Sequence, residues 1–425
     1  MTRRSVDPHE SREPGLSRRG LLGALGVGVG ALAAGAAGPA AAAQQIGAGS
    51  GATAWQPSTE PFFGEHQAGV ATAAQAHVRF VALDLRPGLG RPGIVRLMRL
   101  LTDDIERLTS GRPALADPTP QLAGDPARLT VTVGFGRGLL AAAGLLASAP
   151  AWLDDGLPAF ENDHLRSRWS GGDLLLQVGG DNPLAVSHAV QVLVTDADTF
   201  ASVRWVQSGF HRAGSDAGAP AGPSGAPTGR NLFGQLDGTV NPMVGTLDFD
   251  EVVWVGSRRG APALAWLVGG TALVLRRIAM DLRTWGAVDR TAKEQAVGRR
   301  LSDGAPLTGG DELTAPDYDA VDAHGFPVIP ATSHIRLAHP DDPVQRILRR
   351  PYSYDEGVTE DGTPDTGLLF AAYMADPQTQ FVPIQRRLAK ADLLNLWTRT
   401  IGSALFAIPA GVQPGAIVGQ ALLGR

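Results

Sequence analysis

The chain has 425 residues, 44% of them hydrophobic, with a formal net charge of −5 and no cysteine. This length predicts two domains or an internal duplication, and the negative charge without a basic stripe argues against a nucleic-acid partner. The lack of cysteine excludes disulfides, zinc–thiolate sites, iron–sulfur clusters and C-x-x-C-H attachment motifs.

Residues 1–43 have the pattern of an export signal. The twin arginine Arg18-Arg19 precedes a weakly apolar run, and small residues up to Ala43 fit a cleavage site. An uncleaved membrane anchor is the alternative, which the Ala/Gly content and Pro39 disfavour. The twin-arginine route exports folded proteins, often around a cofactor. We therefore expect a cofactor, and a location in the periplasm, cell envelope or extracellular space.

After a flexible lead-in over 44–61, residues 62–210 predict one ferredoxin-like domain. Alternating apolar residues predict a strand over 76–85, and further strands are predicted over 128–136, 173–181 and 201–210. Helical spacing predicts helices over 93–108 and 182–197. The resulting order, β-α-β followed by β-α-β, is that of a ferredoxin-like unit. A Gly/Pro-rich loop over 211–230 follows.

Residues 231–425 repeat this plan less clearly. We predict strands over 269–282 and 367–374, a strand-like piece over 333–340, a short polar helix over 289–301 and an amphipathic helix within 381–399. Residues 301–331 show no periodicity and predict irregular structure. The fold class is therefore α+β, with two ferredoxin-like halves, and a single αβ sandwich with insertions is the alternative.

Histidine is the natural ligand for a metal in a chain without cysteine. Nine histidines occur, but no H-x-x-x-H or H-E-x-x-H pair, so a helix-borne zinc hydrolase site is unsupported. His334, in PATSHIRLAHP, lies on a short apolar segment two residues before Arg336. A single histidine of this kind is more often a structural residue than a ligand.

Two further motifs place charged residues beside turns. Asp237, in RNLFGQLDGTVNP, stands between Gly234 and Gly238, and such an Asp-Gly pair is more often a turn than a catalytic site. Arg349 and Arg350 precede Pro351. Adjacent arginines usually lie on a solvated surface, but one of them can instead point into a pocket and stabilise negative charge.

Together these motifs resemble the dye-decolourising peroxidase family, in particular its exported, deferrochelatase-like branch, over nearly the whole mature chain. The matching segments are FFGEHQAGVAT, GQLDGTVNP, SHIRLAHP, LRRPYSY and GLLFAAYM, in that order. By this resemblance Asp237 matches the distal aspartate, His334 the proximal haem ligand, with His324 as second choice, and Arg349 the distal arginine. Pro351 stands where relatives commonly have glycine, which leaves Arg350 open as the alternative.

The resemblance implies a dimeric α+β barrel-type fold, with one non-covalent haem b per chain held by residues 231–425. Asp237 would then shuttle a proton, Arg349 would stabilise the leaving oxygen and His334 would bind the iron. Further haem-binding residues implied in this way are Arg336, Leu368, Phe370, Gly238 and Thr239. The second ring nitrogen of the haem-ligating histidine needs an acceptor, for which Asp322 and Asp319 are candidates.

The activity implied is a haem peroxidase that reduces hydrogen peroxide and oxidises dyes, phenols or similar bulky donors. Electrons from large donors could pass through surface aromatics, and Tyr352, Tyr354 and Trp397 are candidates. A haem- or iron-handling protein of iron uptake and a non-enzymatic binding module are the alternatives. The implied partners are hydrogen peroxide, an organic donor, the twin-arginine machinery and, for the alternative, iron-uptake proteins. A homo-oligomer is left open.

Overall fold

The computed structural model describes residues 58–211, 228–256, 264–340, 342–360 and 362–424. The segment predicted to be an export signal, 1–43, lies outside these residues, as do most of the predicted lead-in and most of the predicted loop over 211–230. Within the described ranges, no helix has both the length and the apolar character needed to span a bilayer.

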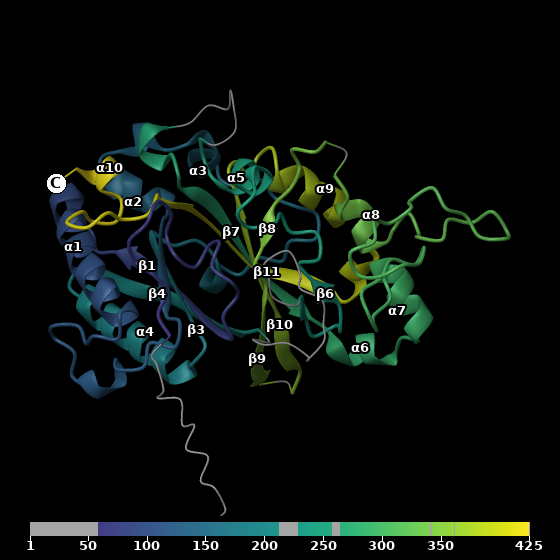
Figure 1. Cartoon of the computed structure of the whole chain (residues 1–425), viewed down its shortest axis with the longest axis horizontal. Coiled ribbons are helices and arrows are strands. Elements are labelled where there is room, and N and C mark those ends of the chain that lie inside the picture. The colour runs from purple at the N-terminus through teal and green to yellow at the C-terminus, as the bar shows by residue number, and fades with distance from the viewer. Residues whose placement is uncertain (1–57, 212–227, 257–263, 341, 361, 425) are drawn as a thin grey trace, which may run out of the picture. The chain divides into compact units, whose positions relative to one another are not determined.

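The described chain alternates between antiparallel strands and mostly short helices (Figure 1). The strands are β1 (His77–Leu85), β2 (Thr130–Phe135), β3 (Leu174–Gly180), β4 (Ala201–Phe210), β5 (Gly229–Arg230), β6 (Leu236–Asp237), β7 (Thr271–Met280), β8 (Leu348–Arg349), β9 (Tyr352–Val358), β10 (Pro364–Met374) and β11 (Thr398–Ile408). The α-helices are α1 (Gly90–Thr109), α2 (Arg137–Ala142), α3 (Ala151–Asp155), α4 (Pro183–Ala197), α5 (Leu247–Val253), α6 (Leu282–Ala287), α7 (Arg290–Val297), α8 (His334–Ala338), α9 (Phe381–Ala391) and α10 (Gln420–Leu423).

The long strands close into one antiparallel ring. Neighbours follow the order β2, β3, β1, β4, β9, β10, β7 and β11, and β8 lies beside β10. The ring closes where Ala407 of β11 pairs with Phe135 of β2, and the halves also meet where Phe210 of β4 pairs with Ser353 of β9. The order across the sheet is β2, β3, β1, β4 in the first half and β9, β10, β7, β11 in the second. With the short strands β5, β6 and β8 left out, both halves therefore follow the order second, third, first, fourth. This repeated ferredoxin-like order confirms the α+β prediction, and the αβ sandwich alternative is wrong.

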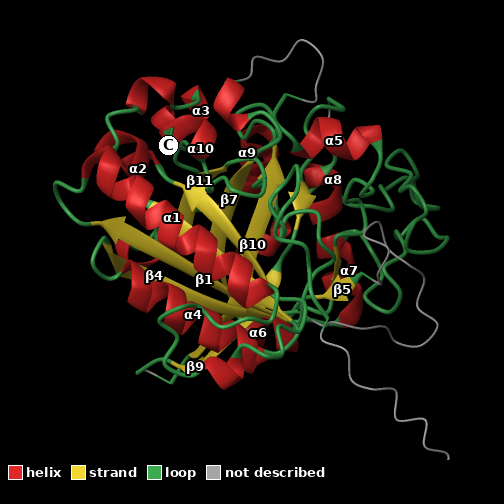
Figure 2. Cartoon of the chain, turned by 60° about the vertical axis from the view of Figure 1, so that its left-hand side comes forward, coloured by secondary structure: helices red, strands yellow, loops and turns green. Residues whose placement is uncertain are grey.

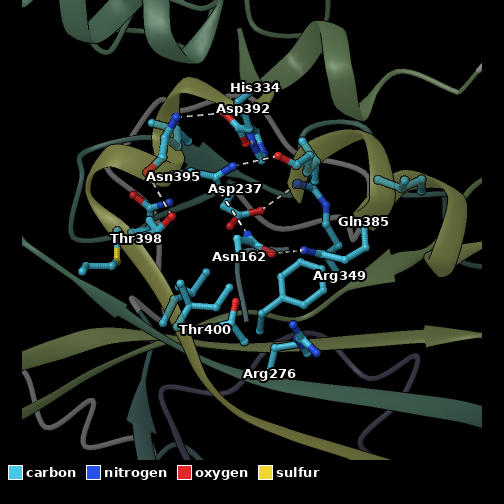
Figure 3. Close-up of a pocket in the computed structure, with 18 of the residues that line it drawn as sticks. Asn162, Asp237, Arg276, His334, Arg349, Gln385, Asp392, Asn395, Thr398 and Thr400 are labelled. Carbon is cyan, nitrogen blue, oxygen red and sulfur yellow. Dashed lines mark hydrogen bonds and ion pairs between the residues drawn. The ribbon is translucent and has the colours of Figure 1, made fainter. Parts of the chain in front are cut away.

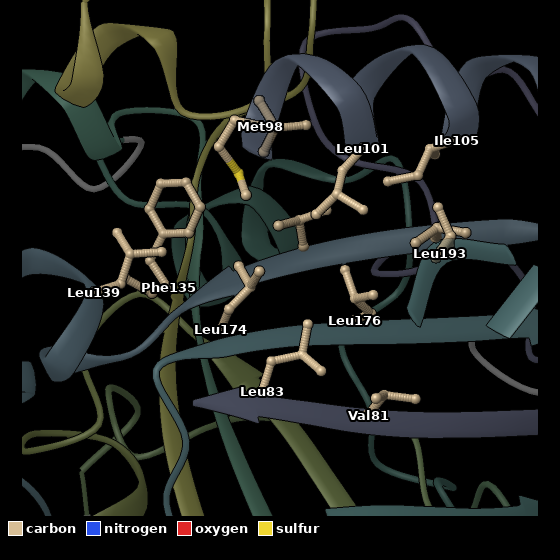
Figure 4. Packing of buried hydrophobic residues seen from close by; sticks show 14 of the residues in the cluster. Val81, Leu83, Met98, Leu101, Ile105, Phe135, Leu139, Leu174, Leu176 and Leu193 are labelled. Carbon is tan, nitrogen blue, oxygen red and sulfur yellow. The ribbon is translucent and has the colours of Figure 1, made fainter. Parts of the chain in front are cut away.

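Strand alternation separates an inner from an outer core. On β1, Phe80 belongs to the cluster enclosed by the ring, whereas Val81 and Leu83 belong to the outer cluster. In the first half, α1 and α4 cover that outer face (Figures 1 and 2). The α1 residues Met98, Leu101 and Ile105 pack over the strands there (Figure 4).

The outer face of the second half is covered differently, and this difference creates the site. Helix α9 occupies the position of α4, while α6, α7, α8 and the irregular segment between α7 and α8 replace the single helix α1 (Figure 1). Side chains on the outer faces of β7, β10 and β11 consequently line a cavity instead of a packed helix. They are Arg276, Ile278, Met280, Leu368, Phe370, Thr398 and Thr400.

Two expectations for the second half are corrected by the structure. Residues 333–340, expected to be strand-like, form the short helix α8, because a brief run of mixed residues does not by itself distinguish helix from strand. Strands β9 and β11 were not predicted. In β11 a bulge between Thr400 and Gly402 shifts the register, which interrupts the alternation that would mark a strand. The expected irregular segment over 301–331 is present.

Candidate functional site

A cavity of about 870 Å³, including its open mouth, lies between α9 and the outer face of the second half. We call it the main cavity. Its walls are mostly apolar. The polar groups in the lining include Asp237, Arg349 and His334, and also Asn162, Asn395 and Arg276 (Figure 3). An apolar cavity with a few convergent polar groups is the usual form of a cofactor or substrate site.

Asp237 reaches the main cavity from the end of a small hairpin. Strands β5 and β6 pair Gly229 with Asp237, and the Asn231 side chain closes the turn by accepting from Phe233 N at 3.0 Å. Gly238 follows with a φ of +119°, a conformation that favours glycine. The turn expected from the sequence is therefore present, and its backbone presents the carboxylate to the cavity.

Arg349 forms an ion pair with Asp237. Its Nη1 lies 3.0 Å from Asp237 Oδ1, and the two side chains are 20% and 13% exposed. The contact lacks the alignment of a hydrogen bond, so Asp237 Oδ1 has no hydrogen-bond donor among the described residues. The pair thus places a fixed positive charge beside a carboxylate that can still accept a hydrogen bond from a ligand.

His334 enters the same cavity at the start of α8. Its Nδ1 lies 2.6 Å from Oδ2 of Asp392, whose side chain is 5% exposed and caps the turn Leu393–Leu396 through Leu394 N. Burial lowers the pKa of His334, but the charge and hydrogen bond of Asp392 outweigh it and raise the pKa overall. With Nδ1 engaged, Nε2 is the ring nitrogen left for a ligand.

These residues fit a haem. The main cavity supplies an apolar enclosure with Phe233, Leu368 and Phe370 among its lining, and His334 supplies a single imidazole ligand oriented by a carboxylate. Arg276 supplies positive charge in the cavity wall, where it is paired with Asp163, and burial lowers its pKa. A non-covalent haem needs such a ligand and enclosure but no cysteine.

A second space, the outer cavity, shares Gln235, Asp237, His334 and Arg349 with the main cavity. Its other walls come from α8 and from the irregular segment that contains Leu313 and Tyr318. Thr239 lies on this side, 8% exposed, and its hydroxyl donates to Glu312 Oε1 at 2.9 Å. Asp237, His334 and Arg349 therefore lie at the boundary between the main cavity and the outer cavity.

The structure brings five of the residues expected at the site into the main cavity: Asp237, His334, Arg349, Leu368 and Phe370. Arg336 is not among them, because its guanidinium donates to Tyr318 O and Ile329 O and so holds the irregular segment against α8. Gly238 and Thr239 follow Asp237 but do not line this cavity.

The structure places the two adjacent arginines on different sides of the sheet. Arg349 lines the main cavity, whereas Arg350 is 7% exposed and lies among inner residues, where it donates to Thr72 O and Gln75 Oε1. Successive strand residues point to opposite faces, so only one of two neighbours can face the cavity. His324, the second choice for the ligand, sits in an exposed turn away from the cavity.

Two expectations about the surroundings are wrong. Asp322 and Asp319 do not contact His334, because Asp322 accepts from His324 N and Phe326 N in its own turn, while Asp319 N donates to Asp317. Tyr352 and Tyr354 are 1% and 0% exposed and lie inside the ring, so they are not surface aromatics. Trp397 is half-buried and packs edge to face against Trp285.

Sequence reasoning missed two residues that hold the site together. Asp392 orients His334 from 58 positions further along the chain, and no local motif marks that pairing. Asn241 bonds to the backbone of Arg349 across 108 positions. The Asn-Pro pair after the Asp-Gly turn was visible in the sequence, but its partner could be found only from the fold.

Comparisons with known proteins show which family models and relatives the chain matches. Models described as Dyp-type peroxidase, N-terminal, and Dyp-type peroxidase, C-terminal, match residues 67–211 and 228–413. A dye-decolorizing peroxidase of Thermobifida fusca is 41% identical, covering 84% of this chain and 83% of that protein. A deferrochelatase of Escherichia coli K12 is 35% identical, covering 98% of this chain and 99% of its own.

Solved structures show the same likeness over most of the chain. The crystal structure of a DyP-type peroxidase from Cellulomonas bogoriensis has a TM-score of 0.80 and 49% identity, covering 87% of this chain and 99% of its own. Ferric DtpA from Streptomyces lividans has a TM-score of 0.81 and 41% identity, covering 87% of this chain and 98% of its own.

Proposed function

Because this chain belongs to the Dyp-type peroxidase family, whose members are haem-dependent oxidoreductases, we propose that it reduces hydrogen peroxide and oxidises bulky dyes, phenols or similar organic donors. The observation that carries the proposal is the meeting of Asp237, Arg349 and His334 at one apolar cavity. We further propose one non-covalent haem b per chain, with His334 as the axial ligand.

The haem, when bound, supplies the oxidising chemistry, and the chain supplies positioning and proton transfer. Asp237 accepts a proton from the inner oxygen of peroxide and returns it to the outer oxygen, which leaves as water. Arg349 holds its charge beside Asp237 and stabilises the negative charge that develops on the leaving oxygen. Asp392 fixes the orientation of the His334 ring through Nδ1. Leu368 and Phe370 exclude bulk water from the cavity wall.

The test is steady-state peroxidase kinetics of haem-reconstituted Asp237→Ala protein with a bulky dye as donor. Loss of the proton-accepting carboxylate should lower kcat/KM for hydrogen peroxide about 100-fold or more, the usual effect of removing a general acid–base. Haem content, read from the Soret band, should stay near that of the unaltered protein. Unchanged kcat/KM in a fully haem-loaded variant would remove Asp237 from the mechanism.

The relatives named deferrochelatase also belong to this peroxidase family, so their name does not favour removal of iron from haem as the alternative activity. Release of iron from bound haem without added peroxide, measured with a ferrous chelator, would reverse this preference.

We also propose that the protein leaves the cytoplasm by the twin-arginine route and acts in the periplasm, the cell envelope or outside the cell. Support comes from Arg18-Arg19 and the apolar run up to Ala43. Replacement of both arginines by lysine should keep the protein in the cytoplasmic fraction. Unchanged export of that variant would contradict the proposal.

A further inference from the structure

A third, smaller cavity leads from Asp237 to a histidine that the peroxidase proposal does not use. This side cavity, about 200 Å³ including its opening, is lined by His211, Ser353, Leu368 and Asp237 together with Gly229, Arg230, Asn231 and Pro351. It borders Asp237 on the side of the β5–β6 hairpin and of β9. The space admits about one ordered water, which its hydroxyl, amide, carboxylate and imidazole groups could hold by hydrogen bonds.

The position of His211 is fixed by three elements. Its backbone N–H donates to Ala76 O at 2.8 Å, just beyond the end of β4. Its ring packs edge to face against Tyr352, with centroids 6.0 Å apart. The ring also covers Gly229 so closely that a Cβ at that position would overlap it. Because Gly229 pairs directly with Asp237 in the hairpin, the imidazole stands behind the strand that presents the carboxylate.

The overall reaction shows why such a histidine is useful. Peroxide reduction consumes protons as well as electrons: H2O2 + 2 H⁺ + 2 e⁻ gives two molecules of water. The proton that Asp237 moves between the peroxide oxygens balances within that step, but the two protons consumed with the donor electrons must come from elsewhere. Donors too large for the cavity give up electrons outside it, so their protons do not arrive with those electrons.

We propose that His211 relays these protons from solvent to Asp237 through the side cavity. This inference rests on the proposed function of the same site. An imidazole titrates nearer neutrality than any other unperturbed side chain, so it can accept a proton from solvent and pass it on in each turnover. Ser353 also lines the side cavity, and a serine hydroxyl can both donate and accept a hydrogen bond.

The charged and titratable groups around His211 are compatible with this role. Asp237 on β6 shares the side cavity, and Tyr352 on β9 contacts the ring. Arg230 on β5 directs its guanidinium to Gly234 O, Leu301 O and Ser302 O. Among the described residues that line the side cavity, Asp237 carries the carboxylate that can accept a proton from His211.

The central experiment compares His211→Gln with Asp237→Asn in the haem-loaded enzyme. We expect His211→Gln to lower kcat, at saturating peroxide and donor, about tenfold at pH 7, less than the loss of a direct acid–base group. It should leave kcat/KM for peroxide within about twofold, because that step needs no external proton. Asp237→Asn should instead lower kcat/KM for peroxide. Packing damage alone would not separate the two constants in this way.

A second readout does not depend on turnover. Hydrogen cyanide must lose its proton to bind ferric haem as cyanide, and its association can be followed by the Soret shift after rapid mixing. We expect His211→Gln to slow association about tenfold near neutral pH and to remove a titration step from the pH profile of the rate. The matched control is His77→Gln, a half-buried histidine on β1 that does not line the side cavity, and it should behave as the unaltered protein.

His211→Phe separates relay from packing, since it keeps an aromatic ring against Tyr352 but cannot carry a proton. It should match His211→Gln, and restored kcat and cyanide association would overturn the relay. Should neither variant fold, the unaltered enzyme must still show a normal solvent isotope effect on kcat, and its absence would also overturn the proposal.

If Asp237→Asn keeps full kcat/KM for peroxide, the proposed function itself is wrong. If only the His211 variants behave as the unaltered protein, the relay alone fails.

Discussion

The carboxamide of Asn241 bonds to the backbone of Arg349 through both of its ends. Nδ2 donates to Arg349 O at 2.8 Å, and Oδ1 accepts from Arg349 N at 3.0 Å. Asn241 follows Asp237 by four positions, and its backbone N–H donates to Gly238 O at 2.9 Å. The turn that presents the carboxylate therefore also fixes the strand that carries its arginine partner.

Loss of this connection should affect activity more than stability. In Asn241→Ala the Arg349 backbone loses both partners, and a displacement of about 1 Å at a catalytic group costs up to about 100-fold in rate. We expect kcat/KM for hydrogen peroxide to fall about 10- to 100-fold at unchanged haem content. The control is Asn182→Ala, which removes the cap of α4 and should cost about 1 kcal/mol of stability with normal kinetics. Equal kinetics in the two variants would contradict the prediction.

Asp392 should determine how strongly the protein holds its haem. Asp392→Asn keeps an oxygen for Leu394 N but removes the negative charge beside His334 Nδ1. Loss of such a partner typically weakens metal affinity about 10- to 100-fold, and titration of the haem-free protein with haem, read at the Soret band, measures it. Asp281→Asn, which alters the cap of α6 away from the cavity, is the matched control. Haem affinity equal to that of the control would rule out this role.

Substitution of Arg349 should lower activity, whereas substitution of the adjacent Arg350 should lower stability. Arg349→Leu should fold normally and lose kcat/KM for peroxide, since its charge lies beside Asp237 at the cavity. Arg350→Leu removes donors from the partly buried Thr72 O and the buried Gln75 Oε1, which should cost about 1–3 kcal/mol of unfolding free energy. Urea unfolding and peroxide kinetics of both variants separate the two effects. The assignment is wrong if the losses are exchanged between the variants.

Asp104 on α1 should make stability depend on pH. Burial, together with the charge of Asp196, raises its pKa from 3.8 to about 7. The folded protein thus binds this proton more tightly than the unfolded chain, so the contribution is complete below about pH 4 and is lost as the pH rises to about 7. Asp104→Asn removes the charge that the folded state disfavours at high pH.

We therefore expect Asp104→Asn to raise the free energy of unfolding by about 1–2 kcal/mol at pH 8 relative to the unaltered protein. The gain should disappear near pH 4. Urea unfolding of the haem-loaded protein at the two pH values measures it, with the exposed neighbour Asp103→Asn as control. A gain that does not change with pH would show that the Asp104 proton is not responsible.

The sequence by itself determined the local features of this protein. Alternation identified β1, apolar strand-like runs identified β2, β3, β4, β7 and β10, helical spacing identified α1, α4 and α9, and the Asp-Gly pair identified the turn at Asp237. These follow from interactions over a few residues, in which the period of apolar positions reports the local conformation. The ordered motifs were also enough to predict the family.

Only the tertiary structure decided which residues complete the site. Asp392 and Asn241 reach His334 and Arg349 across 58 and 108 positions, and His211 shares a cavity with Asp237 because β4 ends beside the β5–β6 hairpin. The same holds for Arg349 and Arg350, whose different positions depend on which face of the sheet borders the cavity. Such pairings depend on how the ring of strands closes, and no short stretch of sequence contains that information.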